Sequence, residues 1–339
     1  MVNSSDRNVI VIAEIGVNHN GSLELAKQLV DACSVAGADY AKFQTFRASE
    51  LASADAPLAE YQRNSSEGQG QRDLLASLEL SQQQFAELEA YCGEKDIGFL
   101  TTAHDLASAP FVMGLKSDFI KVPSGDVTNY PFLCLVAEQG TPVLLSTGAS
   151  ASDEVGEAIE VLESAGLSRS LVTVLQCTTE YPAPFPEANL LAMVEMGKTW
   201  GVKIGFSDHT EGHDAAVAAV ALGASVLEKH ITLDKSMPGP DHAASLEPDE
   251  FAALVQRVRL TQELRGKPEK MVTPSESKNR DIIRKSIVAG DYIRQGEVLS
   301  ENNLSVMRPG TGVSPMRWPD VVGTRAHRSY VPGELIELP

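Results

Sequence analysis

The stretch VIVIAEIGVNHNGSLELAKQLVDACSVAGADYAKFQ, residues 9–44, contains the unit on which the fold prediction rests. Its apolar runs at 9–13 and 40–44 are short and almost uninterrupted, which is typical of strands buried on both faces of a sheet. Between these runs, residues 24–36 place their apolar side chains on one stripe of an amphipathic helix. The stretch therefore predicts a strand, a helix and a second strand parallel to the first.

The same unit recurs along the first 265 residues. Further short apolar runs follow at 97–101, 118–122, 142–146, 171–176, 202–206 and 225–230, which makes eight in all. Amphipathic helical patterns separate them, and one of these begins at Ser81, which forms a capping box with Gln84. Eight such units predict an α/β fold of the TIM (β/α)8 barrel type, with a doubly wound parallel sheet as the alternative.

Two segments interrupt this pattern. Residues 52–73 contain few large apolar side chains and predict a long loop, either a lid over a site or a solvated insertion. Residues 266–282 have the polar, proline-containing composition of a linker. The predicted organisation is a barrel at 1–265, this linker, and a small β-rich domain without a large core at 283–339.

Composition excludes several classes of protein. Acidic residues outnumber basic ones by 46 to 28, a formal net charge of −18, which argues against a surface that binds nucleic acid or an anionic membrane but leaves room for a small basic pocket. No apolar run approaches the ~20 residues that span a bilayer, and the run before Glu14 is too short for the core of a signal peptide. The four cysteines form no CxxC pair. We expect a cytoplasmic protein.

Polar side chains gather where the predicted strands end. In a barrel these ends meet at one face, where enzymes of this fold carry their reacting groups. Buried charged groups are costly unless they are paired or used, so their recurrence around the ring predicts an active site. The residues are Glu14, Asn18, His19, Lys42, Gln44, Thr102, Lys121, Ser124, Ser146, Thr147, Gln176, Ser207, Asp208, His209, Glu228, Lys229 and His230.

Two histidines at the ends of neighbouring strands, His209 and His230, could face one metal position. Two imidazoles with oxygen ligands suit a divalent transition ion such as manganese and leave space for a substrate and water. The rival pair is His209 with His213, which has the spacing of two ligands on one helix face but falls in a predicted loop. His104 and His242 fit supporting or structural roles better, and the role of His19 stays undecided.

Two lysines also end predicted strands. Lys42 and Lys121, with Ser124, Ser146 and Ser207, could hold a phosphate and a carboxylate through charge-assisted hydrogen bonds. The alternative is that each lysine is paired with a carboxylate for structural reasons. Neither a GxxxxGK[ST] nor a GxGxxG motif opens a strand–helix unit, so nucleotide binding is not expected.

Taken together, these motifs closely resemble the sialic acid synthase family, which includes N-acetylneuraminate, legionaminate and pseudaminate synthases. They follow the family order along almost the whole chain, and the C-terminal part resembles the SAF (antifreeze-like) domain. The matching stretches are AEIGVNHNGS at 13–22, KFQTF at 42–46, KVPSGD at 121–126, NYPFL at 129–133, LSTGAS at 145–150, QCTTEYPAP at 176–184, GFSDHT at 205–210, EKHITLDKSMPGPDH at 228–242 and VMRPGTG at 306–312.

The resemblance implies a carbon–carbon bond-forming transferase that condenses phosphoenolpyruvate with an open-chain N-acetylmannosamine-type sugar and releases phosphate. It implies a divalent metal, most commonly Mn²⁺, with Mg²⁺ or Co²⁺ as alternatives. By motif, the metal ligands would be His209 and His230, the phosphoenolpyruvate site would contain Lys42, Thr102, Lys121, Ser124, Ser146 and Ser207, and the sugar site would contain Glu14, Gln44, Thr179, Tyr181 and Asp241. Glu14 would also serve as the acid/base.

Arg308, in VMRPG, resembles an arginine that the SAF domain of one family subunit inserts into the barrel of its partner, where it contacts the N-acetyl group of the sugar. The resemblance therefore implies a domain-swapped homodimer.

The stretch CTTEYP bears on the sugar. Thr179 departs from the asparagine of neuraminate-type enzymes, and with KFQTF the stretch looks more like the legionaminate branch, whose sugar is a 2,4-diacetamido-2,4,6-trideoxymannose. Glu180 is either functional or an exposed loop carboxylate. The alternatives are a pseudaminate synthase, another phosphoenolpyruvate-using aldulosonate synthase, or a non-enzymatic carbohydrate-binding module, which would leave the ring of strand-end side chains unexplained.

Overall fold

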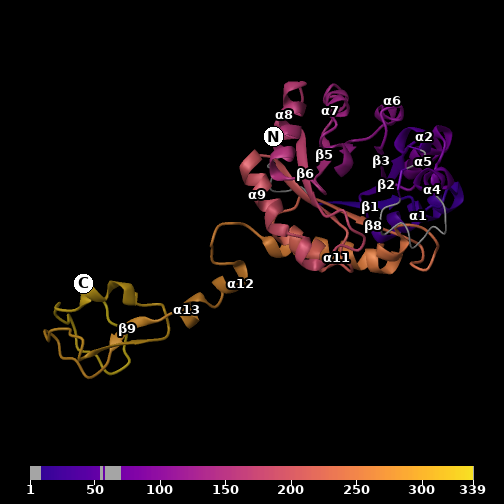
Figure 1. Cartoon of the computed structure of the whole chain (residues 1–339). Helices are drawn as coiled ribbons and strands as arrows, with labels where there is room; N and C mark the ends of the chain where they lie inside the picture. The colour runs from indigo at the N-terminus through magenta and orange to yellow at the C-terminus, as the bar shows by residue number, and fades with distance from the viewer. Residues whose placement is uncertain (1–8, 54–55, 58–69, 339) are drawn as a thin grey trace. The chain divides into compact units, whose positions relative to one another are not determined.

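A computed structural model describes residues 9–53, 56–57 and 70–338. The chain divides into two compact units, Met1–Gly266 and Lys267–Pro339 (Figure 1).

The first unit is built on an eight-stranded parallel sheet in the order β3-β2-β1-β8-β7-β6-β5-β4. The first strand pairs with both the second and the last, and the Cα atoms of the two strands at the ends of this order come within 8 Å of each other. The prediction of a TIM barrel is confirmed, and the doubly wound alternative is wrong, because such a sheet would not pair its first strand with its last. The strands are β1 Ile10–Gly16, β2 Tyr40–Thr45, β3 Gly98–Ala103, β4 Ile120–Val122, β5 Val143–Ser146, β6 Val172–Cys177, β7 Lys203–Asp208 and β8 Val226–His230.

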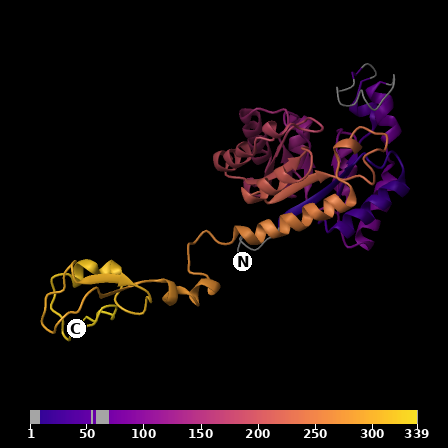
Figure 2. The same ribbon diagram turned by 90° about the horizontal axis from the view of Figure 1, so that it is seen from below.

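Helices follow the strands and cover the outside of the sheet, and Figure 2 shows the longest, α11, lying along one side of this unit. Local signals set their ends: Ser22 Oγ accepts from Leu25 N at the start of α1, Gly37 ends it with φ 82°, and Ser81 and Gln84 form the predicted capping box of α5. The α-helices are α1 Leu23–Ala36, α2 Ala48–Leu51, α4 Gln71–Leu78, α5 Gln82–Glu94, α6 Ala109–Gly114, α7 Tyr130–Ala137, α8 Ser152–Ser164, α9 Leu190–Trp200, α10 Asp214–Ala221 and α11 Pro248–Arg265. Short 3-10 turns cover Ser124–Asp126, Arg169–Leu171, Phe185–Glu187 and His242–Ala244.

The inside of the barrel consists of layers. Side chains that point inward recur every second residue along a strand. One apolar layer comes from alternating positions of five strands, and the inward positions two residues further along several of these strands are polar. The apolar layer contains Ile12, Leu100, Leu144, Leu175 and Val226, all buried. This layer forms the floor under the C-terminal ends of the strands.

The second unit has a small core of its own. Its only strands among the described residues, β9 Ser286–Ala289 and β10 Leu304–Met307, pair antiparallel, while Val298 and Leu335 form isolated bridges. Tyr330 is 1% exposed and packs with surrounding aliphatic side chains. The other elements are the 3-10 turn Pro315–Arg317 and α14 Trp318–Val321.

The two interrupting segments differ from expectation in detail. The predicted linker contains two short helical pieces, α12 Pro274–Ser277 and α13 Arg280–Ile283, of which the second runs one residue beyond it. A Thr273–Glu276 capping box explains the first. Of the predicted loop at 52–73, the last three residues already belong to α4, and residues 54–55 and 58–69 lie outside the described part. No helix among the described residues is long and apolar enough to cross a membrane.

The tight interior yields a test at Gly205 in β7. A Cβ atom there would lie 2.5 Å from Leu175 Cδ2 and 2.6 Å from the Val226 carbonyl oxygen. We expect Gly205→Ala to lower the free energy of unfolding by about 1–3 kcal/mol, because the layer has no space for the methyl group. Gly93→Ala in α5 is the matched control, since nothing lies within 4 Å of its Cβ, and we expect it to stabilise by about 0.5–1 kcal/mol. Denaturant unfolding measures both, and a loss of the same size in both variants would contradict this packing.

Candidate active site

Strand register brings the predicted site residues together above the apolar floor. Glu14 in β1 pairs with Lys42 in β2 on one side and with His230 in β8 on the other. Ser207 in β7 pairs with Glu228 in β8. Glu14 therefore lies within its strand, and not after it as expected, but its side chain still faces the predicted site.

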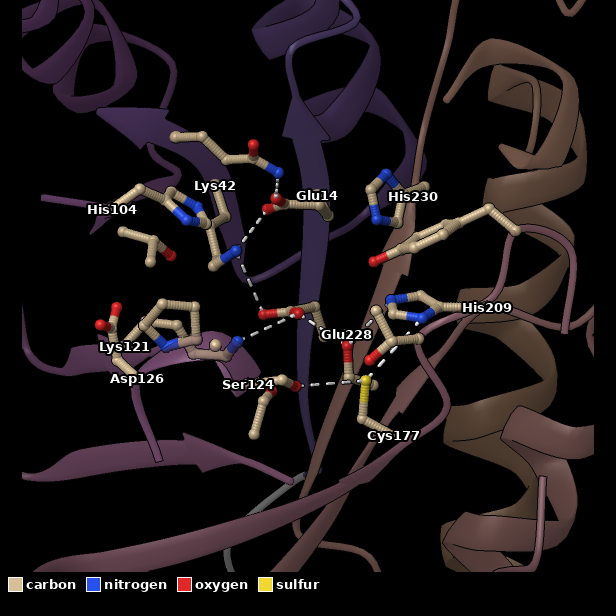
Figure 3. A pocket seen from close by; sticks show the side chains of 18 of the residues that line it. Glu14, Lys42, His104, Lys121, Ser124, Asp126, Cys177, His209, Glu228 and His230 are labelled. Atoms are coloured by element: carbon tan, nitrogen blue, oxygen red, sulfur yellow. Dashed lines mark hydrogen bonds and ion pairs between the residues drawn. The ribbon is translucent and has the colours of Figure 1, made fainter. Parts of the chain in front are cut away.

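These side chains surround a cavity of about 280 Å³ (Figure 3). Of the residues to which the resemblance gives a metal, substrate or catalytic role, all except Asp241 and Arg308 line it. The other strand-end residues predicted for the site do not line this cavity: Asn18, His19, Thr147, Gln176, Asp208 and Lys229. The lining residues are Glu14, Lys42, Gln44, Leu51, Thr102, His104, Lys121, Pro123, Ser124, Gly125, Asp126, Ser146, Cys177, Thr179, Tyr181, Ser207, His209, Glu228 and His230.

The two exceptions, Asp241 and Arg308, lie elsewhere. Asp241 is buried behind the cavity, with Oδ2 3.8 Å from Nδ1 of His230, and burial, with Glu14, raises its pKa to about 6. Arg308 belongs to the second unit, where its Nε donates to the Ile283 carbonyl at 3.1 Å. Arg308 therefore has a local partner within its own unit.

The Glu228 carboxylate is the centre of the charge network (Figure 3). Its Oε2 lies 3.5 Å from Lys42 Nζ, its Oε1 lies 3.5 Å from Lys121 Nζ, and Ser207 Oγ donates to Oε1 at 2.8 Å. Lys42 also contacts Glu14 Oε2 at 2.7 Å. The alternative that each lysine is paired with a carboxylate thus holds geometrically, with two lysines facing the two carboxylates Glu14 and Glu228.

The surroundings shift the pKa values of Lys42, Lys121 and Glu14 in different ways. Burial lowers the pKa of Lys42, but Glu14 and Glu228 outweigh it and the pKa is raised overall. For Lys121 burial prevails over Glu228, and the pKa is lowered. Burial raises the pKa of Glu14 above its usual value, even though Lys42 opposes this. A buried carboxyl with a raised pKa is suited to carry a proton.

His209 and His230 form one wall of the cavity with Tyr181. The two imidazole centroids lie 5.5 Å apart, and the Tyr181 ring lies 4.1 Å from His209 and 5.6 Å from His230. His209 Nδ1 is 2.6 Å from the Thr178 carbonyl oxygen, to which it donates, and Nε2 lies 3.5 Å from Ser207 Oγ. Burial lowers the pKa of His209, but Cys177 and the Thr178 carbonyl outweigh it and the pKa is raised overall. Burial and His209 keep the pKa of His230 well below its usual value, which leaves that ring neutral.

Several buried polar atoms of the cavity have no hydrogen-bond partner among the described residues. They are Thr102 Oγ1, Ser146 Oγ, His230 Nδ1 and Glu228 Oε2. Because buried polar groups are normally satisfied, such a cluster indicates a polar ligand. The described part of the chain contains no group of three or more His, Cys, Asp or Glu that could hold a metal, so an ion at the two histidines would need oxygen ligands from substrate or water.

Family comparison agrees with this geometry. The NeuB family pattern matches residues 29–270, and the SAF domain pattern matches residues 284–338. The chain belongs to the NeuB family. This membership confirms the resemblance inferred from the motifs, including the SAF domain at the C-terminal end.

Relatives of this NeuB-family chain are nonulosonic acid synthases. The N,N'-diacetyllegionaminic acid synthase of Campylobacter jejuni is 43% identical over 97% of this chain and 99% of its own length. The enzyme of the same name from Legionella pneumophila is 40% identical over 95% and 91%. A solved structure, the N-acetylneuraminic acid (sialic acid) synthetase of Leptospira borgpetersenii in complex with citrate, is 28% identical with a TM-score of 0.71, over 80% of this chain and 90% of that one. The chain is thus a synthase of the sialic acid and legionaminate type.

Besides Pro123 and Gly125, five residues that line the cavity have no metal, substrate or acid/base role assigned from the sequence. The sequence did indicate that Glu228 faces the site, because it lies two residues before His230 on one strand and so points to the same side. The others, which the structure adds to the cavity wall, are Leu51, His104, Asp126 and Cys177.

A second buried ion pair holds the loop that carries His209. Lys229 Nζ lies 3.0 Å from Asp208 Oδ2, and both side chains are fully buried. Asp208 Oδ1 accepts from both the backbone nitrogen and the hydroxyl of Thr210 at 2.8 Å. Lys229 and Asp208 are therefore structural. They position His209, which lies between Asp208 and Thr210 in the sequence.

This pair predicts a pattern of stability. We expect Lys229→Met to lower the free energy of unfolding by about 3–5 kcal/mol, since it leaves Asp208 buried and unpaired. The double variant with Asp208→Leu removes that unpaired charge and should recover part of the loss. Denaturant unfolding of both measures this, and a double variant no more stable than Lys229→Met alone would argue against the pair.

Proposed function

We propose that the chain condenses phosphoenolpyruvate with 2,4-diacetamido-2,4,6-trideoxymannose to give N,N'-diacetyllegionaminate and phosphate. The observation that carries the proposal is the pair of buried lysines, both in contact with Glu228, in a cavity with unpartnered hydroxyls. The two legionaminic acid synthases described above, similar over nearly their full lengths, support the choice of product.

Phosphoenolpyruvate is assigned to the lysine side of the cavity. Lys42 and Lys121 would supply positive charge, and the unpartnered Thr102 and Ser146 hydroxyls would donate to its phosphate or carboxylate oxygens. Ser124 and Ser207 line the same side. Charge-assisted hydrogen bonds in a buried site are strong, which suits a highly charged substrate.

The reaction forms one carbon–carbon bond and breaks one carbon–oxygen bond. C3 of phosphoenolpyruvate attacks the sugar aldehyde, whose oxygen takes up a proton, and water adds at C2 with loss of a proton. The resulting tetrahedral intermediate expels phosphate. Glu14 is the acid/base for these transfers, because its buried carboxyl has a raised pKa and lies 2.7 Å from Lys42. Gln44 Nε2 donates to Glu14 Oε1 at 3.0 Å and orients it.

His209 and His230 fit a divalent metal, with Mn²⁺ proposed first and Mg²⁺ or Co²⁺ as alternatives. The two rings lie on one wall with centroids 5.5 Å apart, and His230 Nδ1 has no hydrogen-bond partner among the described residues. When bound, the ion would polarise the aldehyde as a Lewis acid. Tyr181 and Asp241, which contact these histidines, would then lie beside the aldehyde end of the sugar, and Thr179 would contribute to the same substrate site.

Phosphate release tests the proposed function. We expect release only when phosphoenolpyruvate, a divalent metal and a mannosamine-type sugar are all present, with the highest kcat/KM for the 2,4-diacetamido-2,4,6-trideoxy sugar of manno configuration. A chelator should abolish release and Mn²⁺ should restore it. Preference for N-acetylmannosamine, or for the sugar precursor of pseudaminate, would overturn the choice of product, and a phosphorylated aldose as best substrate would favour another aldulosonate synthase.

Arg308 is proposed to complete the sugar site of a partner subunit in a domain-swapped homodimer. Mixing Arg308→Ala with a Lys121→Met subunit tests this, because only the mixed dimer then combines an intact barrel with an intact arginine. Action in trans should restore about a quarter of wild-type activity, since half of the dimers are mixed and each has one working site. Two inactive variants that stay inactive after mixing and refolding would indicate action in cis.

A further inference from the structure

The proposed reaction does not use two of the residues that line the cavity, Leu51 and His104. Leu51 ends α2, and His104 directly follows β3. In the sheet, β2 and β1 separate β3 from β8, and Figure 3 shows His104 on the opposite side of Lys42 and Glu228 from the two metal-site histidines. We refer to Leu51 and His104 as the distal wall.

Hydrogen bonds hold the two segments of this wall to each other. His104 N donates to the Thr45 carbonyl at 3.0 Å, which continues the pairing of β3 with β2. One residue further on, Asp105 Oδ2 accepts from Arg47 N at 2.9 Å, at the residue that precedes α2. The position of Leu51 is thereby linked to that of His104, as a specific binding surface requires.

The His104 ring is a neutral group with unused hydrogen-bonding capacity. No hydrogen bond to its side chain occurs among the described residues, although it lines a polar cavity. Burial, and then Lys42 and Lys121, lower its pKa to about 3, so the ring stays neutral near pH 7. A neutral imidazole offers one donor and one acceptor, which matches an amide or a hydroxyl of a ligand.

Leu51 differs from its neighbours in chemistry. It is the one long aliphatic side chain among the described lining residues, and 36% of its surface is exposed. An apolar side chain at the edge of a polar cavity gains free energy when an apolar group of a ligand covers it. A methyl group on the sugar would be such a group.

We propose that the distal wall recognises the end of the sugar that is remote from the aldehyde, with His104 bonding the 4-acetamido group and Leu51 packing against the C6 methyl. The inference rests on the proposed function, which assigns the aldehyde to the His209 and His230 wall. An open-chain sugar whose aldehyde lies at the wall of His209 and His230 would extend across the cavity towards Leu51 and His104. The wall therefore sets selectivity for a 4-acetamido-6-deoxy sugar over N-acetylmannosamine.

The test compares kcat/KM for the two sugars in the full-length protein at saturating phosphoenolpyruvate and Mn²⁺. We expect Leu51→Asn, which keeps the size of the side chain, to lower the ratio of the two values about tenfold, the scale of one lost methyl contact. His104→Phe should lower the ratio by a similar factor, and His104→Gln, which retains a donor and an acceptor, should restore part of it. If N-acetylmannosamine is not turned over, its inhibition constant replaces its kcat/KM.

Leu106→Asn is the matched control, because Leu106 is 49% exposed in the same loop and does not line the cavity. It should leave the ratio unchanged, and thermal unfolding should show that all variants are folded. Equal losses with both sugars, or a rise confined to the KM for phosphoenolpyruvate, would overturn the role of the wall while the proposed function stands. No phosphate release by the unmodified protein with any mannosamine would overturn the proposed function and the wall together.

Discussion

Side-chain alternation inside a closed barrel is the constraint on which the site depends. Each inward-pointing residue is followed two residues later by another. The strands that supply the side chains of the apolar floor therefore also supply the side chains of the layer above it. Ile12 is followed in this way by Glu14, and Val226 by Glu228 and then His230. Because β1 pairs with β2 and β8, closure of the ring places these side chains around one cavity. The same packing that makes the floor tight at Gly205 thus fixes the geometry above it.

In that upper layer, opposite charges offset the free-energy cost of burying one another. Burying a lone lysine would cost several kcal/mol, but Glu228 lies within 3.5 Å of both Lys42 and Lys121. Glu14 pairs with Lys42 as well, so an anion that entered the cavity would find two lysines already buried and held in place. Lys229 and Asp208 also offset each other's buried charge. This pair does not line the cavity, and it holds the loop that carries His209.

Much of this could be predicted from the sequence because the relevant signals are local. Short apolar runs located all eight strands, and the polar residues at their ends located the site. The sequence could not show which groups pair, since this depends on register: the sharing of Glu228 by two lysines follows from how β8 lies beside its neighbours. The sequence could not predict that Leu51 and His104 line the cavity, because their segments are far apart along the chain and are joined by the hydrogen bond from Arg47 to Asp105. Arg308 lies in the second unit, and its role therefore stays a prediction.

The apolar floor has a kinetic consequence. Ile12, Leu100, Leu144, Leu175 and Val226 close the barrel directly beneath the lysine layer. In the proposed reaction the ligand of the lysines would therefore be the deepest one, and the sugar would lie between it and the mouth. In the proposed reaction phosphoenolpyruvate must then arrive before the sugar, and the phosphate formed at the floor must wait until the nine-carbon product has left. The order of events is thus a property of the barrel's shape, independent of the affinity of either substrate.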